Sequence, residues 1–264
     1  MAGVAPVPRR AGDHAGVAVH NHLRRLILQG RLPPGTILKQ IELAPSLGVS
    51  PTPLREAIMR LQEEGLVEAV PQRRARVVGF DAAQLESIFV QRILLESLGA
   101  RMTTERITPA KLEEIDKRLL EGARLTTRHR RLTRTAFEQW QEFNRDFHLC
   151  LVAELGPGTL DVVGRLIDRG GHYFLARVYR LSDLHRKDAR VHWPSVGLDW
   201  LIASAEHERI AEAFRLGDAD RASASLAAHL AGTVLTSLKE LEPDYEPKAV
   251  KAAMAITCPG FECA

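Results

Sequence analysis

The stretch GVSPTPLREAIMRLQEEGLV, residues 48–67, combines a helix-start signal with an amphipathic helix. Ser50 or Thr52 can cap the helix, and Pro51 or Pro53 fits its first turn, where a missing N–H costs nothing. Apolar residues then recur at helical spacing and predict one buried face: Leu54, Ile58 and Leu61. The question is whether the start of this helix faces solvent, a core or a phosphate backbone.

The flanking segments complete a small domain. Residues 17–30 have a helical apolar period that ends at Gly30, residues 31–38 indicate a turn, and residues 41–48 indicate a short second helix. Pro45 is unexpected there unless it falls in the first turn. Two β-like segments, Leu66–Val70 and Ala75–Phe80, then flank a basic tip at residues 72–74. This order predicts a winged helix-turn-helix domain over residues 16–80.

The chemistry of this domain suits DNA. The second helix of the pair would aim its positive N-terminal end and free N–H groups at a phosphate or a groove. Arg55 could reach a guanine edge, and the wing arginines could meet phosphates. The candidate DNA contacts are Ser50, Thr52, Arg55, Arg60, Arg73, Arg74 and Arg76. Spacing alone equally fits a helical hairpin with solvated arginines.

Composition sets the broad class. The 264 residues, 45% apolar and 26% charged, suit a soluble protein of two domains. Residues 1–80 hold 11 Lys and Arg against 6 Asp and Glu, whereas the remainder holds 25 against 27, which suggests a polyanion partner at one end. No apolar run approaches the roughly 18 residues of a membrane span. Residues 1–15 read as a disordered arm without a secretory signal, and three cysteines without a disulfide framework favour the cytoplasm.

The remaining sequence predicts an all-α helical bundle over residues 82–241, with a polar connection at 185–197. Its candidate helices are 82–105, 109–127, 132–155, 158–182, 198–216 and 218–241. Residues 242–264 form a C-terminal tail that contains Cys258 and Cys263, which we expect to be unstructured. The whole chain is therefore mainly α, with two domains of different construction.

Three histidines stand out in the bundle. His148, His207 and His229 each lie on the apolar side of a different helix, and Asn144 precedes His148 by one turn. Such residues are satisfied core histidines or ligands of a metal between helices, and the residues alone leave both interpretations open. Asp146 points elsewhere on its helix. The neighbours of His207, Glu206 and Glu208, are expected to point away from it.

Both domains resemble one family of regulators. LILQGRLPPGTIL and IELAPSLGVSPTPLREAIMRLQEEGLV resemble the DNA-binding domain of GntR-family transcriptional regulators. RILLESLGARM, FNRDFHLCLVAELG and AEHERIAEAFRLGDADRASASLAAHL resemble the helical ligand-binding domain of the FadR subfamily. This sequence departs from the family at Pro51, where an arginine is usual, and at Arg74, where a glycine is usual. We expect DNA binding to persist with an altered sequence preference.

The resemblance also implies a ligand site. The positions of the family's metal ligands are Asn144, His148, His207 and His229 here, for a divalent ion such as Zn²⁺, Ni²⁺ or Mn²⁺ and without an organic cofactor. Because Asn144 replaces a carboxylate, three neutral histidines would leave the charge of the ion uncompensated and favour an anionic effector. Arg92 and Arg177 are candidate anion clamps, although Arg92 could instead pair with Glu96.

The resemblance implies a homodimeric regulator that binds a pseudo-palindromic DNA operator and releases it when a small carboxylate binds. A helical metalloenzyme that activates water is the rival hypothesis, but it leaves the winged domain unexplained. A regulator that acts without an effector is the third.

Overall fold

The computed structural model describes residues 7, 15–71, 74–128, 133–181 and 197–258, without the side chains of 134, 177–181 and 197–202. Most of the arm, Arg73 of the wing tip, most of the polar connection and Cys263 therefore lie outside the described residues. The chain forms two compact units, residues 1–80 with 171–180, and residues 81–170 with 181–264. Sequence patterns did not indicate that residues 171–180 group with the first unit.

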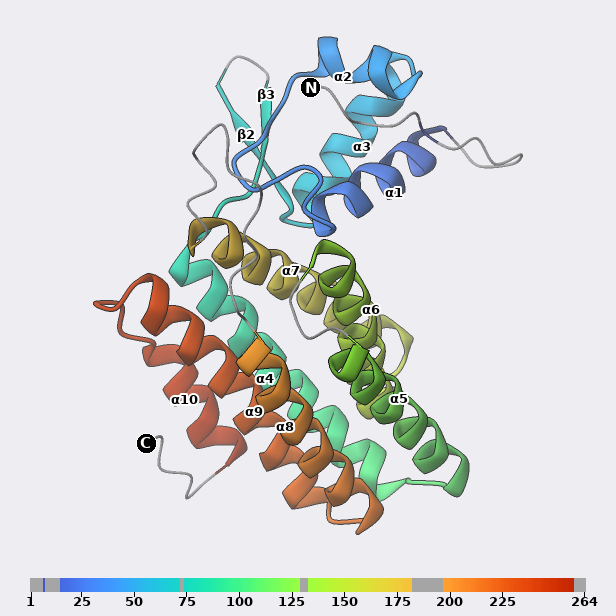
Figure 1. The fold of residues 1–264 in the computed structure, drawn as a ribbon, viewed down its shortest axis with the longest axis vertical. Helices are drawn as coiled ribbons and strands as arrows, with labels where there is room; N and C mark the ends of the chain where they lie inside the picture. Colours follow the sequence, from blue (N-terminus) through green and yellow to red (C-terminus); the bar gives the residue numbers. More distant parts are fainter. Residues whose placement is uncertain (1–6, 8–14, 72–73, 129–132, 182–196, 259–264) are drawn as a thin grey trace. The chain divides into compact units, whose positions relative to one another are not determined.

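The first unit is the predicted winged helix-turn-helix (Figure 1). Its helices are α1 (Ala15–Leu28), α2 (Gln40–Leu47) and α3 (Pro51–Glu63). Apolar residues that recur every three or four positions on α1 and α3 face each other and are buried: Val19, Leu23, Ile27, Leu54, Ile58 and Leu61. This shared core fixes the pose of α3.

A three-stranded antiparallel sheet forms the wing. Its strands are β1 (Ile37–Leu38), β2 (Val67–Val70) and β3 (Arg74–Val77), in the order β1-β3-β2. Glu68 pairs with Arg76 in the register of β2 and β3. The expected strand up to Phe80 ends three residues earlier, and residues 37–38, which the sequence indicated as part of a turn, pair with β3. A two-residue strand is too short to leave an alternating pattern.

Pro45 lies in the interior of α2 and not in its first turn. A proline at this place removes the hydrogen bond to the carbonyl of Ile41, a residue that is 90% exposed. The helix ends soon afterwards at Gly48, whose φ of 67° is the left-handed conformation that glycine adopts without strain. The proline therefore removes one backbone hydrogen bond close to the end of α2.

The second unit is, in its described residues, the predicted all-α bundle. Its elements are α4 (Ala82–Glu105), α5 (Pro109–Arg128), α6 (Arg134–Leu151), the 3₁₀ turn η1 (Ala153–Leu155), α7 (Pro157–Leu181), α8 (Gly197–Arg215), α9 (Ala219–Leu241) and α10 (Lys248–Thr257). The last turns of α7 group with the first unit. Figure 1 shows α9 and α10 along α4, which also packs against α6. Helix α4 has buried residues along its whole length and packs against α6, η1, α9 and α10, so it is the central helix of the bundle.

Side-chain caps explain where three of these helices begin. Asp81 accepts a hydrogen bond from the backbone N–H of Gln84, and Asp218 accepts one from that of Arg221. The hydroxyl of Thr133 accepts from the N–H of Ala136. Such caps satisfy N–H groups that have no partner within the helix. The starts of α4, α6 and α9 are therefore set by local sequence.

The expectation of an unstructured tail is wrong for residues 248–258. Helix α10 packs on α4 and α9, and Cys258 at its end is buried. The buried carboxylate of Glu86 accepts hydrogen bonds from the backbone N–H of Ala249 at 2.7 Å and from the hydroxyl of Tyr245 at 2.6 Å. This long-range anchor, which joins residues more than 150 positions apart, has no signature in the local sequence.

Two helical glycines give a test of the packing. At Gly122 of α5 a Cβ atom would come within 2.3 Å of the ring of Phe143, whereas at Gly232 of α9 it would meet nothing within 4 Å. We expect Gly122→Ala to lower the free energy of unfolding by about 1–3 kcal/mol because it overpacks the core. Gly232→Ala should raise it by about 0.5–1 kcal/mol. Urea unfolding measures both, and a neutral Gly122→Ala would contradict this packing of α5 on α6.

Candidate functional site

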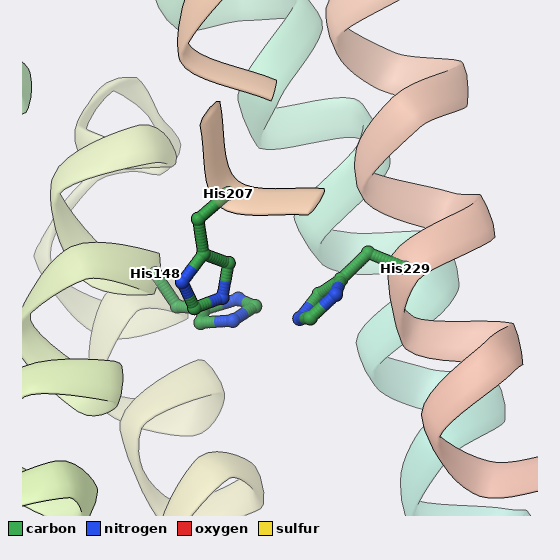
Figure 2. Close-up of side chains that lie close together, drawn as sticks. All are labelled: His148, His207 and His229. Carbon is green, nitrogen blue, oxygen red and sulfur yellow. The ribbon is translucent and has the colours of Figure 1, made fainter. Parts of the chain in front are cut away.

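Three helices bring three imidazole rings together inside the second unit. His148 lies on α6, His207 on α8 and His229 on α9, and all three are buried. One ring nitrogen from each lies within 4.8 Å of the other two (Figure 2). Residues up to 81 positions apart therefore converge on one point, where nitrogen ligands suit a divalent metal ion.

An aromatic wall covers one side of this cluster. The ring of Phe147 lies 4.6 Å from that of His207, and Trp140 stacks nearly parallel to His207 with an interplanar angle of 11°. Phe143 also contacts His207, with ring centroids 5.8 Å apart. These residues occupy one stripe of α6 and exclude water from the imidazoles, which strengthens electrostatic interactions within the cluster.

Two carboxylates fix the tautomers of two rings. Nδ1–H of His148 donates to Oε2 of Glu96 at 2.6 Å, and Nδ1–H of His229 donates to Oε2 of Glu206 at 2.7 Å. A carboxylate accepts only, so the proton of each neutral ring resides on Nδ1 and the Nε2 lone pair is free. This arrangement is the carboxylate–histidine pair that orients metal-binding imidazoles.

Three further ring nitrogens of the cluster have no hydrogen-bond partner among the described residues. They are Nε2 of His148 and both ring nitrogens of His207, all of them buried. Buried polar atoms normally form hydrogen bonds, because leaving one unpaired costs about 1–3 kcal/mol. A cation at the centre of the cluster would satisfy the lone pairs of all three rings. The residues present therefore fit a divalent ion.

Lowered pKa values keep two of these histidines in the neutral form that binds metal. Burial lowers the pKa of His148 to about 4, although Glu96 opposes the shift. Burial also places the pKa of His207 well below its ordinary value, and His229 and His148 add to the effect. Both rings are therefore neutral near pH 7, and neutral imidazole is the form that coordinates a metal.

Arg92 is paired with Glu96 rather than free. Its Nε donates to Oε1 of Glu96 at 2.6 Å, and both side chains are buried. Burial alone would raise the pKa of Glu96, but the charge of Arg92 and the contact with His148 outweigh it and lower the pKa to about 2. Of the two alternatives that the sequence left open for Arg92, the structure shows the structural pairing.

One sequence-based expectation about Glu206 is wrong. Its side chain does not point away from the cluster, because α9 packs against α8 and brings His229 to it. Glu208 does point away and pairs with Arg215 at 2.8 Å on the surface. The expectation that no carboxylate compensates a bound ion therefore needs correction. Neither Glu96 nor Glu206 takes the place of a ring as a ligand, but each accepts a hydrogen bond from the Nδ1–H of one ring.

The other predicted ligand-site residues lie on α6 and α7. Asn144 is half-buried one helical turn before His148. Asp146, discounted as a ligand, is exposed, and its carboxylate lies 3.1 Å from Arg118. Arg177 belongs to α7, but its side chain is outside the described residues.

In the first unit, the predicted DNA contacts of α3 lie on its exposed side. Thr52, Arg55 and Arg60 are all exposed, as is Ser50, which occupies the cap position without a capping hydrogen bond from its side chain. Pro53 at the third helical position has no N–H to offer to that hydroxyl. Pro51 likewise removes one of the free N–H groups expected at this helix start. Contacts to a phosphate at this helix start therefore depend more on side chains than on backbone N–H groups.

The described part of the wing presents two arginines. Arg74 and Arg76 are exposed on β3, and Nε of Arg76 donates to Oε1 of Glu68 across the strand pair at 2.8 Å. Arg73 lies outside the described residues. The pair with Glu68 is about half exposed and so holds Arg76 only weakly. Among the described helices, none is both long and apolar enough to span a membrane.

Comparison with known proteins covers both units. Residues 16–77 match the family "Bacterial regulatory proteins, gntR family", and residues 87–232 match the FCD domain. An uncharacterized HTH-type transcriptional regulator in the TAR-I ttuE-ttuC' intergenic region of Agrobacterium vitis is 32% identical over 153 residues, which cover 56% of this chain and 88% of the relative.

Two further matches extend the comparison. The HTH-type transcriptional repressor RspR of Escherichia coli is 27% identical over 155 residues, which cover 57% of this chain and 65% of RspR. The solved structure of E. coli McbR/YncC has a TM-score of 0.64 at 20% identity, over 86% of this chain and 99% of that one. The latter likeness concerns the fold.

The pairing of Arg92 and Glu96 gives a test of the site without metal. Glu96→Ala leaves a buried guanidinium unpaired and should lower the free energy of unfolding by about 3–5 kcal/mol, measured by urea denaturation with a chelator present. Glu208→Ala breaks an exposed pair and should cost at most about 1 kcal/mol. Equal losses in the two variants would contradict the buried pair.

Proposed function

Because the chain belongs to the GntR family of bacterial regulatory proteins and carries an FCD domain, we propose that it is a homodimeric repressor that a small carboxylate releases from DNA. It is a DNA-binding transcriptional regulator and not an enzyme, as both domain matches and the named relatives indicate. The observation that supports a ligand response is the set of buried, unpartnered histidine nitrogens inside the FCD domain.

His148, His207 and His229 would hold a divalent ion, with the amide oxygen of Asn144 as a further ligand. Zn²⁺, Ni²⁺ and Mn²⁺ all accept imidazole and amide donors. When bound, the ion supplies a positive charge to which a carboxylate oxygen can coordinate. The chain's own contribution is to hold the rings of His148 and His207 neutral, to orient two rings through Glu96 and Glu206, and to exclude water with the wall of Phe147 and its neighbours.

The charge of the site supports an anionic effector. All four proposed ligands are uncharged donors, Glu96 is neutralised by Arg92, and the single charge of Glu206 offsets only part of the charge of a divalent ion. The centre therefore stays positive when an ion is bound, and a carboxylate would reduce that charge. Arg92 could contact the effector only by sharing its guanidinium with Glu96. Arg177 remains a second proposed clamp.

The winged domain would contact one half-site of a two-fold operator in each protomer. Arg55, one turn into α3, is the proposed base contact, whereas Ser50, Thr52 and Arg60 would contact the backbone. Arg73, Arg74 and Arg76 would meet phosphates or the minor groove. Repression is supported by the name of one relative, RspR. Effector binding would then shift the spacing of the two recognition helices within the dimer.

The DNA contact can be tested on operators found by the protein itself. Genomic fragments selected with the purified protein at near-physiological salt should share a two-fold motif. On such a fragment Arg55→Ala should weaken binding by about 1–3 kcal/mol, because it removes a bidentate contact to a base. Arg221→Ala, an exposed arginine of α9, is the control and should have no effect.

The salt dependence separates two kinds of contact. If Arg55→Ala weakens binding equally on all DNA and reduces the salt slope, the residue touches only phosphate. Selection without any enriched motif, with and without metal, would contradict the proposed operator.

The ligand response predicts coupling between metal and carboxylate. Zn²⁺ titrations with and without a panel of small carboxylates should show tighter metal binding in the presence of the effector, since each ligand neutralises charge for the other. A coupling of about 1–3 kcal/mol is typical for linked sites. Equal Zn²⁺ affinities with every carboxylate would contradict the coupling and favour a regulator that acts without an effector.

A further inference from the structure

Glu206 connects two of the three histidine-bearing helices. It precedes His207 on α8, and its Oε2 accepts the hydrogen bond from Nδ1–H of His229 on α9 at 2.7 Å. Its side chain is 23% exposed and that of His229 is 7% exposed. A single carboxylate thus sets the tautomer of one proposed ligand from the helix that provides another.

The two carboxylates behind the cluster differ in their own partners. Glu96 shares its charge with buried Arg92, whose Nε lies 2.6 Å away, so this pair is neutral as a unit. The basic group that contacts Glu206 among the described residues is Arg209, at 3.6 Å, and the Arg209 side chain is 69% exposed. An ion pair so open to solvent is strongly screened. Glu206 therefore presents negative charge to the cluster that Glu96 does not.

None of the proposed ligands carries a negative charge. Asn144 provides a neutral oxygen one turn before His148. We propose that Glu206 compensates for this residue: it is a positioning residue that orients His229 and supplies, through the imidazole, the negative charge that Asn144 lacks. A carboxylate behind a metal-bound histidine makes that ring a stronger donor. This inference rests on the metal site of the proposed function.

The experiment measures the affinity of the full-length protein for Zn²⁺ and Co²⁺ in competition with a chelator, with the Co²⁺ absorption spectrum as a second readout. Glu206→Ala removes both the hydrogen bond and the charge and should weaken Zn²⁺ binding by about 10–100-fold. Glu206→Gln keeps an acceptor for Nδ1–H of His229 and should weaken Zn²⁺ binding by a smaller factor than Glu206→Ala does. Glu208→Gln, two residues further along α8 in a surface pair with Arg215, is the matched control and should bind as the wild type does.

A variant with a carboxylate at position 144 tests whether Glu206 compensates for the neutral Asn144. Asn144→Asp adds a carboxylate ligand and should tighten Zn²⁺ binding, and in this background Glu206→Gln should cost less than in the wild type. Unfolding curves recorded with chelator establish that each variant is folded before its affinity is compared.

The outcomes distinguish this inference from the proposed site. If the wild type binds Zn²⁺ and both Glu206 variants bind within about twofold of it, far short of the loss expected for a histidine without its carboxylate, the role of Glu206 is refuted while the metal site stands. An equal cost of Glu206→Gln in the wild type and in the Asn144→Asp background would refute the compensation. If the wild type binds neither metal, the site and this inference both fail.

Discussion

The contact between the Glu96 carboxylate and the ring of His148 joins the central helix α4 to α6 in the interior of the second unit. Two buried polar groups are costly unless each has a partner, and Arg92 provides the second partner of Glu96. Arg92, Glu96 and His148 are thus linked in a row through Nδ1 of His148, and its Nε2 has no partner among the described residues. The geometry of the candidate site follows from that arrangement.

Missing hydrogen-bond partners also explain why polar side chains are exposed at the start of α3. Prolines at its first and third positions remove backbone donors, so the Ser50 hydroxyl has no capping bond and stays exposed with Thr52 and Arg55. A start without its usual donors would bind phosphate less well than an ordinary helix terminus. In the first unit, the exposed side chains at the start of α3 are the proposed DNA contacts. In the second unit, the buried imidazole nitrogens without a partner are the proposed metal ligands.

Much of the fold follows from sequence periodicity, because the core faces of α1, α3 and the bundle helices repeat at helical spacing and their ends have caps or glycines. The same periodicity placed the three histidines on inward faces. It could not place Glu206 against His229, or Glu86 against α10, because these contacts depend on how distant helices pack. Spacing on one helix shows which residues share its face, but it does not show which neighbour a flanking side chain will reach. The helix at 248–257 was missed for that reason.

We propose that the three buried histidines hold a metal ion within a DNA-binding regulator. The most direct measurement is anomalous diffraction on both sides of the zinc edge, from crystals of the full chain grown with Zn²⁺. We expect a peak at about 2.0–2.1 Å from one ring nitrogen each of His148, His207 and His229. Zinc peaks confined to surface positions, with the three rings arranged as in Figure 2, would contradict it.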